Sequence, residues 1–129
     1  MPTPRKTIAI VDDDASVRKA LERQLCAAGY RCATFESAEE FLLVARILKA
    51  SCLLADINLG GMSGLDLAVH PTVTGLMLPV VLISGSNDPR VEVPAREIGA
   101  AFLRKPIPSQ VLLDAIVDNA GPPFADGEY

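Results

Sequence analysis

Five polar side chains stand just after short apolar runs, at widely separated points of the sequence. Three are carboxylates, one is a hydroxyl and one is an ammonium: Asp12, Asp13, Asp56, Ser84 and Lys105. Hard divalent cations such as Mg²⁺ prefer oxygen ligands, and a lysine ammonium attracts phosphate oxygens. Brought together, these groups would form a site for a divalent cation and a phosphoryl group.

The apolar runs that precede these side chains have the length and composition of strands. They cover residues 7–11, 31–35, 51–55, 79–83 and 101–103. Nearly uniform apolar strands that alternate with helices indicate an α/β fold, with a parallel sheet covered on both faces. In such a sheet, functional groups gather beyond the carboxyl ends of the strands. We therefore expect the five polar side chains to line one crevice.

Amphipathic segments separate the runs and are predicted to be helices. Asp14 is expected to cap the first of them, and Ser37 with Glu40 forms a capping-box signature for the second. The third is short, from about residue 63 to 69, and the sequence His70-Pro71 is expected to end it. Residues 88–98 form the fourth, which Pro94 should kink or shorten. The last begins at Pro108.

Length and composition restrict the class of protein. A chain of 129 residues, half of them hydrophobic, fits one folded domain, which we place at residues 1–121 with a flexible tail at 122–129. The net charge of −4 and the lack of a basic block argue against nucleic-acid binding by this chain. No apolar run is long enough for a membrane span or a signal peptide, so we expect a cytoplasmic location. The three cysteines are expected to be buried, unreactive thiols.

The motifs, in this order, resemble the receiver domain of two-component response regulators, most of all those related to nitrogen-fixation control. The resemblance covers about residues 6–119 and rests on four segments: Val11-Asp12-Asp13-Asp14, Ala55-Asp56 with Met62-Ser63-Gly64, Ile83-Ser84-Gly85, and Arg104-Lys105-Pro106. It implies a doubly wound, flavodoxin-like sheet of five parallel strands in the order 2-1-3-4-5.

The resemblance also implies a role for each acidic residue. Asp56 would accept a phosphoryl group from a phosphohistidine on a sensor histidine kinase or a phosphotransfer protein. Asp12, Asp13 and Asp56, with the backbone carbonyl of Asn58, would hold Mg²⁺. The chain would then be a bacterial phosphoprotein in a signalling relay rather than a turnover enzyme.

Five further features follow from the same resemblance. Lys105 would contact the acyl phosphate, and the Lys105–Pro106 peptide bond would be cis. Ser84, where threonine is commoner, would turn to hydrogen-bond the phosphate, and Phe102 would move inward behind it. The surface of the fourth helix, fifth strand and fifth helix would receive a second copy or a downstream protein.

One departure from the family pattern leaves alternatives open. Leu59-Gly60 stands where the family usually has Met-Pro, and glycine in place of proline should loosen the loop after Asp56. A pseudo-receiver that binds partners without phosphorylation is therefore one alternative. The other is a haloacid-dehalogenase-like phosphatase with Asp12 as nucleophile and Asp14 as acid/base. For that second alternative, the chain lacks a further acidic pair after Lys105, and Asp56 would have no role.

Overall fold

The computed structural model describes residues 5–85 and 89–124. Its strands are β1 (Thr7–Val11), β2 (Arg31–Phe35), β3 (Cys52–Asp56), β4 (Val80–Ser84) and β5 (Ala101–Arg104). All neighbouring pairs are parallel, and the sheet has the order β2-β1-β3-β4-β5. The predicted fold class and strand order are confirmed.

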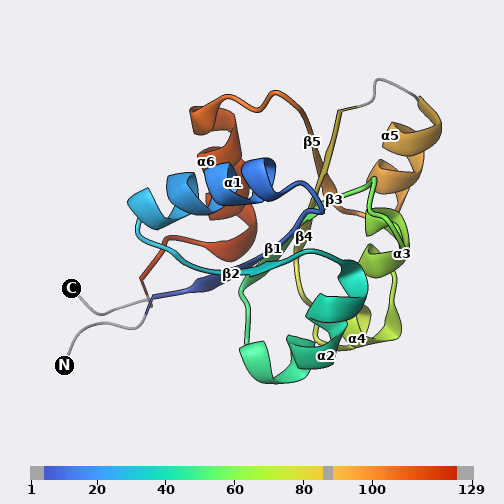
Figure 1. Cartoon of the computed structure of the whole chain (residues 1–129), viewed down its shortest axis with the longest axis horizontal. Helices are drawn as coiled ribbons and strands as arrows, with labels where there is room; N and C mark the ends of the chain where they lie inside the picture. Colours follow the sequence, from blue (N-terminus) through green and yellow to red (C-terminus); the bar gives the residue numbers. More distant parts are fainter. Residues whose placement is uncertain (1–4, 86–88, 125–129) are drawn as a thin grey trace.

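Helices cover both faces of this sheet. They are α1 (Ala15–Ala27), α2 (Ala38–Leu48), α3 (Gly64–Ala68), α4 (Pro71–Gly75), α5 (Pro89–Glu97) and α6 (Ser109–Ala120). Figure 1 shows α1 and α6 on one side of the sheet and α2, α3, α4 and α5 on the other. Strands covered on both faces are apolar along most of their length, and β3 and β4 are buried at every residue, including Asp56 and Ser84 at their ends.

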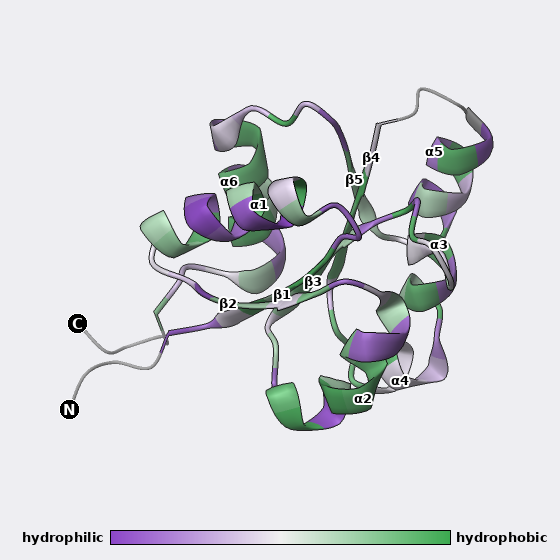
Figure 2. Ribbon diagram, viewed as in Figure 1, coloured by the Kyte–Doolittle hydropathy of each residue, from purple (hydrophilic) through white to green (hydrophobic). Residues whose placement is uncertain are grey.

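Two hydrophobic clusters fill the space between the sheet and these helices. Successive residues of a strand point to opposite faces, so Ile8 and Ile10 pack toward α1 and α6, while Ala9 and Val11 pack toward α2. In Figure 2 the strands at the centre are mostly green, whereas purple collects on the outer sides of the helices. The sheet is therefore a rigid platform whose carboxyl edge carries the polar groups.

The segment after α3 differs from the prediction. His70-Pro71 does end α3, but it also begins a helix that the sequence analysis did not predict. His70 is the N-cap of α4, and its Nδ1 accepts a hydrogen bond from the Thr72 amide at 3.1 Å. Proline suits the first turn of a helix because its missing N–H would have no partner there. The predicted fourth helix is thus α5 and the predicted fifth is α6.

Pro94 shortens helix α5 less than expected. The helix spans Pro89–Glu97 and continues through Pro94, close to the predicted range 88–98. Asp88, where we expected it to begin, lies outside the described residues. Glu92 of α5 pairs with Arg96 one turn later and with Arg104 at the end of β5. The pair with Arg104 connects α5 to the edge strand, whereas the pair with Arg96 lies within the helix.

The cysteines require one correction. Cys52 is buried and Cys32 is half-buried, but Cys26 is exposed, because it lies on the outer side of α1. At the other end of the chain, two residues of the predicted flexible tail contact the N-terminal segment. The Lys6 amide donates to the Pro123 carbonyl at 2.7 Å, and Arg5 pairs with Phe124 in an antiparallel bridge. The domain boundary at residue 121 stays a prediction.

Within the described residues, no helix combines the length and apolarity needed to cross a membrane.

Candidate phosphoacceptor and cation site

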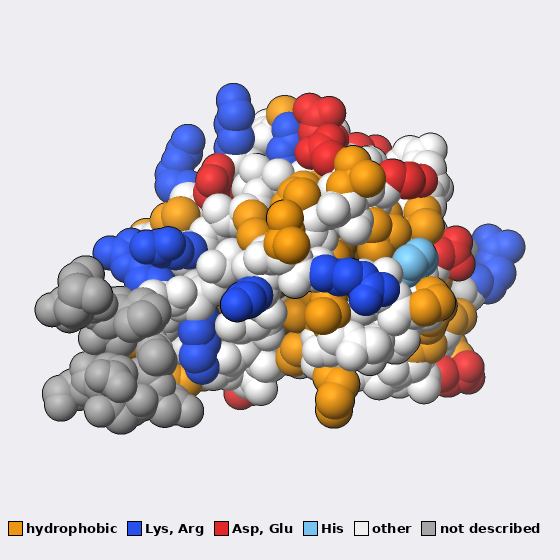
Figure 3. All heavy atoms as spheres, turned by 90° about the horizontal axis from the view of Figure 1, so that it is seen from below, with side chains coloured by type: hydrophobic (Ala, Val, Ile, Leu, Met, Phe, Trp, Pro, Cys, Tyr) orange, Lys and Arg blue, Asp and Glu red, His pale blue; other side chains and the backbone are white. Residues whose placement is uncertain are grey.

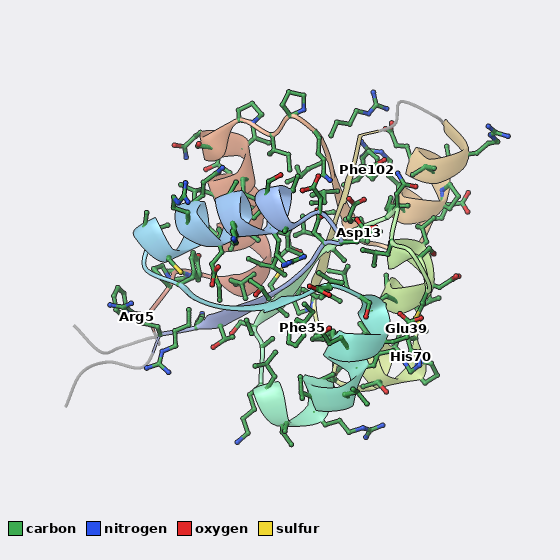
Figure 4. All side chains as sticks on the ribbon, in the orientation of Figure 1. Arg5, Asp13, Phe35, Glu39, His70 and Phe102 are labelled. Atoms are coloured by element: carbon green, nitrogen blue, oxygen red, sulfur yellow. The ribbon has the colours of Figure 1, made fainter. Side chains whose placement is uncertain are left out.

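The carboxyl ends of β1 and β3 bring three aspartates to one place. Asp12 and Asp13 follow β1, and Asp56 is the last residue of the neighbouring strand β3. Carboxylate oxygens of the three lie within 4.8 Å of one another. Asp12 is fully buried and Asp56 is 5% exposed, whereas Asp13 is exposed and faces solvent. Figure 4 labels Asp13 at this edge of the sheet.

Lys105 neutralises part of this negative charge. Its Nζ lies 2.6 Å from Asp56 Oδ2 and 3.3 Å from Asp12 Oδ2. Burial lowers the pKa of Lys105, but the hydrogen bond to Asp56 and the charges of Asp56 and Asp12 outweigh burial and raise this pKa overall. Lys105 therefore stays charged and holds two carboxylates of different strands together.

Backbone amides fix the remaining carboxylate oxygens. The Asp14 amide donates to Asp12 Oδ1 at 2.9 Å, and the Asn58 amide donates to Asp56 Oδ1 at 2.8 Å. Burial raises the pKa of Asp12, although the hydrogen bond from the Asp14 amide and the charge of Lys105 act against it. Each buried carboxylate thus has one oxygen held by the backbone and the other directed at Lys105.

These carboxylates suit a hard divalent cation. At metal–oxygen bonds of about 2.1 Å, two ligands of one Mg²⁺ ion are at most about 4.2 Å apart. The 4.8 Å limit on the separations of the three carboxylates is close to that span. Asp12, Asp13 and Asp56 can therefore hold a metal ion.

Asp14 belongs to a different part of the structure. Its carboxylate caps α1 by accepting from the Ser16 amide at 2.9 Å and from the Ser16 hydroxyl at 2.7 Å. These hydrogen bonds, led by the one from the Ser16 hydroxyl, lower the pKa of Asp14. The three consecutive acids are thus two site residues and one helix cap, as the sequence predicted for Asp14.

Ser84, Phe102 and Pro106 lie on the far side of Asp56 from β1. Ser84 is buried at the end of β4, the strand next to β3, and its carbonyl accepts from the Lys105 amide at 2.9 Å. Phe102 lies on β5, labelled in Figure 4, and its half-buried side chain packs on the core shared with α2 and α5. The Lys105–Pro106 peptide bond is cis.

The loop after Asp56 is held more firmly than its glycines suggest. The Gly64 amide donates to the Ile57 carbonyl at 3.0 Å, and the Met62 amide donates to Glu39 Oε2, also at 3.0 Å. Glu39, labelled in Figure 4, belongs to the first turn of α2. Neither Gly60 nor Gly61 has a positive φ. One hydrogen bond joins the two ends of the loop and the other attaches the loop to α2. Both oppose the loosening that the glycines would cause.

Substitution of Gly60 by alanine is expected to stabilise the protein. A Cβ atom at Gly60 would have Asp13 Oδ2 at 4.0 Å as its nearest neighbour, which is an ordinary contact. Because the backbone there suits any residue, Gly60→Ala should raise the free energy of unfolding by about 0.4–1 kcal/mol through the unfolded chain. Urea denaturation of both proteins measures this. A loss of stability would mean that Gly60 needs a conformation that alanine avoids.

Two residues at this site were missed by the sequence analysis. Glu39 stands beside the capping-box residue Glu40 and was given no role, and its partner Met62 is 23 positions away. Arg18 of α1 donates to the Asp12 carbonyl at 2.7 Å and lies 3.7 Å from a carboxylate oxygen of Glu36. Helical periodicity places both on exposed sides of helices, and no local pattern reveals which loop they meet.

Comparison with known proteins agrees with this geometry. The family model described as the response regulator receiver domain matches residues 8–117. Among curated proteins, Nodulation protein W of Bradyrhizobium diazoefficiens is 36% identical over 111 residues, which cover 85% of this chain and 49% of that protein. The DNA-binding transcriptional regulator NtrC of Klebsiella pneumoniae is 40% identical over 112 residues, which cover 86% of this chain and 24% of that regulator.

Solved structures give the same result. The structure titled FixJ-N is 31% identical, with a TM-score of 0.79, and the match covers 90% of this chain and 93% of that one. Full-length FixJ from B. japonicum is 29% identical, with a TM-score of 0.82, and the match covers 91% of this chain and 58% of that one. The chain spans about half the length or less of the curated regulators named above. With its acidic site and its sheet order, the chain belongs to the response regulator receiver domain family, as a receiver similar to those of nitrogen regulators.

Proposed function

We propose that the domain accepts a phosphoryl group on Asp56 and acts as a signalling switch rather than as a turnover enzyme. The observation that carries this proposal is the nearly buried Asp56 carboxylate, 2.6 Å from Lys105 Nζ and beside Asp12 and Asp13. Membership of the receiver family supports it. Sites of this kind transfer phosphoryl groups mainly by positioning and charge neutralisation.

In the proposed reaction, a carboxylate oxygen of Asp56 attacks the phosphorus of a phosphohistidine. The new O–P bond forms as the N–P bond breaks, and the electron pair returns to the imidazole nitrogen of the donor. Asp12, Asp13, Asp56 and the carbonyl of Asn58 would hold Mg²⁺, which supplies charge neutralisation for the phosphoryl oxygens. Lys105, which is already hydrogen-bonded to Asp56, would then contact the oxygens of the acyl phosphate.

The new phosphate would then change the neighbouring strands. It adds about −1.5 to −2 charges and strong acceptor oxygens beside β4. The hydroxyl of Ser84, at the end of β4, would donate a hydrogen bond to one of these oxygens. Phe102 on β5 would then move inward behind Ser84. We propose that this rearrangement alters the surface of α5, β5 and α6, where Glu92 and Arg104 form an ion pair.

The proposal includes a cytoplasmic location and two groups of partners. A sensor histidine kinase or a phosphotransfer protein would deliver the phosphoryl group. A second copy or a downstream protein would bind the surface of α5, β5 and α6. Neither nucleic acid nor a membrane is proposed as a partner of this chain.

Incubation with acetyl phosphate and Mg²⁺ tests the proposal. We expect intact-mass spectrometry to detect one added phosphoryl group, and chelation of Mg²⁺ with EDTA to prevent the addition, because the carboxylates and the phosphate then repel one another. Reductive cleavage of the acyl phosphate, followed by peptide mapping, should locate the group at Asp56. A covalent phosphate at Asp12 with turnover of phosphomonoesters would instead favour a haloacid-dehalogenase-like phosphatase.

The same sample distinguishes the pseudo-receiver. Such a protein would gain no mass with acetyl phosphate and would show no spectral change with beryllofluoride and Mg²⁺. The hydrogen bonds that hold residues 57–64 favour the phosphoaccepting alternative, because they keep Asp56 and Asn58 in a fixed relation. A null result in both measurements would overturn the proposal.

A further inference from the structure

A second surface of the domain combines exposed apolar side chains with basic ones. It is formed by Leu43, Arg46, Ile47 and Lys49 of α2 and its C-cap and by Leu76 and Met77 after α4, and we call it the α2–α4 surface. Leu43 is 83% exposed, Ile47 is 77% exposed and Met77 is 87% exposed, the highest values for large apolar residues in the described part of the chain. Figure 3 looks onto this end of the molecule and shows orange and blue side chains next to each other.

A groove crosses the α2–α4 surface. It has a volume of about 220 Å³ and lies between the end of α2 and the residues that lead into β4, with Ala45, Arg46, Lys49, Ala50, Leu76 and Leu78 as its lining. Leu43 and Ile47 lie one turn apart on the same helix and add exposed apolar side chains to the surface outside the lining of the groove. A helix that binds a groove places apolar residues at this same spacing. The shape therefore fits an amphipathic helix.

Two residues of this surface have a backbone conformation that is uncommon for their residue types. Lys49 has a φ of 57° and Met77 a φ of 54°, and they are the non-glycine residues with positive φ in the described part of the chain. Lys49 is the C-cap of α2, a position close to the one where glycine is common. Both side chains are exposed, so packing does not explain why they replace glycine.

Charge decides what kind of helix would bind. Arg46 and Lys49 have no ion pair with any described residue. In a symmetric dimer through this surface the same two cations would face their copies across the interface, and like charges disfavour that arrangement. An acidic partner would neutralise them.

We propose that the α2–α4 surface binds an acidic amphipathic helix of a partner protein. One apolar side chain of that helix would enter the groove, others would cover Leu43, Ile47 and Met77, and its carboxylates would pair with Arg46 and Lys49. The surface lies where β3 and β4 begin, and Asp56 lies where β3 ends. Binding there requires no phosphoryl transfer and leaves the surface of α5, β5 and α6 free.

Synthetic helical peptides test this proposal with the whole chain. One probe carries leucine along one side and glutamate along both flanks, and its partner probe has lysine at every glutamate position. We expect fluorescence anisotropy to show at least about tenfold tighter binding of the glutamate peptide, weakened by added salt. Amide chemical shifts should change at residues 43–49 and 76–77.

Matched double variants complete the test. Leu43→Ser with Ile47→Ser should lower the affinity for the glutamate peptide by at least about tenfold. Ala20→Ser with Ala27→Ser, at two exposed sites of α1 on the other side of the sheet, should leave it unchanged. Both doubles should keep the native circular dichroism spectrum and, with acetyl phosphate, wild-type phosphoryl acceptance, so failure here differs from failure at Asp56.

Three outcomes would overturn the proposal. The first is equal binding of the two peptides or shift changes confined to other residues. The second is a dimer in sedimentation experiments that the Leu43/Ile47 double variant abolishes, which would assign the surface to a second copy. The third is binding to phosphatidylserine vesicles that the same variant abolishes.

Discussion

Asp56→Asn is expected to abolish phosphoryl acceptance while preserving the fold. The amide of asparagine lacks the anionic oxygen that attacks phosphorus, so no mass increase should follow incubation with acetyl phosphate and Mg²⁺. Its side-chain oxygen can still accept from the Asn58 amide, which donates to Asp56 Oδ1 at 2.8 Å in the wild type. Lys105 keeps Asp12 as a partner at 3.3 Å. The folded structure should therefore survive the substitution.

Asp14→Asn is the matched control for this experiment. Asp14 stands two residues from Asp12, but it caps α1 and is absent from the group of carboxylates around Asp56. Asparagine is also a good N-cap, so the helix should be retained. We expect wild-type phosphorylation in Asp14→Asn. Unchanged labelling of Asp56→Asn would place the phosphoacceptor elsewhere and would contradict the site assignment.

The sequence predicts the site well because topology does most of the positioning. Asp12, Asp56 and Ser84 lie far apart in the chain, yet each follows an apolar strand. Parallel strands direct their carboxyl ends to one edge, so the position of a residue along its strand determines where it lies in space. The same reasoning places Lys105 there, at 2.6 Å from Asp56. Strand order was implied by the family resemblance, and the structure agrees with it.

The remaining features depend on contacts that no local pattern encodes. Helix α4 has five residues, and its main stabilising features are a histidine cap and a first-turn proline, which we interpreted only as the end of the preceding helix. The Glu39 carboxylate accepts a hydrogen bond from the Met62 amide because the fold brings α2 next to the loop after β3. Cys26 has apolar neighbours in sequence, but it is exposed because it falls on the outer side of α1. In each case tertiary packing determines the local structure, the contact or the exposure of the side chain.

Gly64→Ala is expected to have the largest effect on stability. A Cβ atom at this position would clash with the Asp56 carbonyl oxygen and lie 2.9 Å from the Ile57 Cα, and both are backbone atoms that no side-chain rotation can move. The backbone of α3 must therefore approach the end of β3 without a side chain between them. We expect the free energy of unfolding to fall by about 2–3 kcal/mol, as for an overpacked core. Chemical denaturation measures this loss.

The same substitution should slow phosphorylation, because relief of the contact displaces Asp56 or the loop that holds Asn58. Gly60→Ala is the control, since it adds the same methyl group to the same loop with no atom nearer than 4.0 Å. The two alanine variants should thus change stability in opposite directions. If Gly64→Ala were as stable as the wild type and accepted phosphate at the same rate, α3 would not need its close approach to β3. The glycine of the Met62-Ser63-Gly64 segment would then have no steric role in placing Asp56.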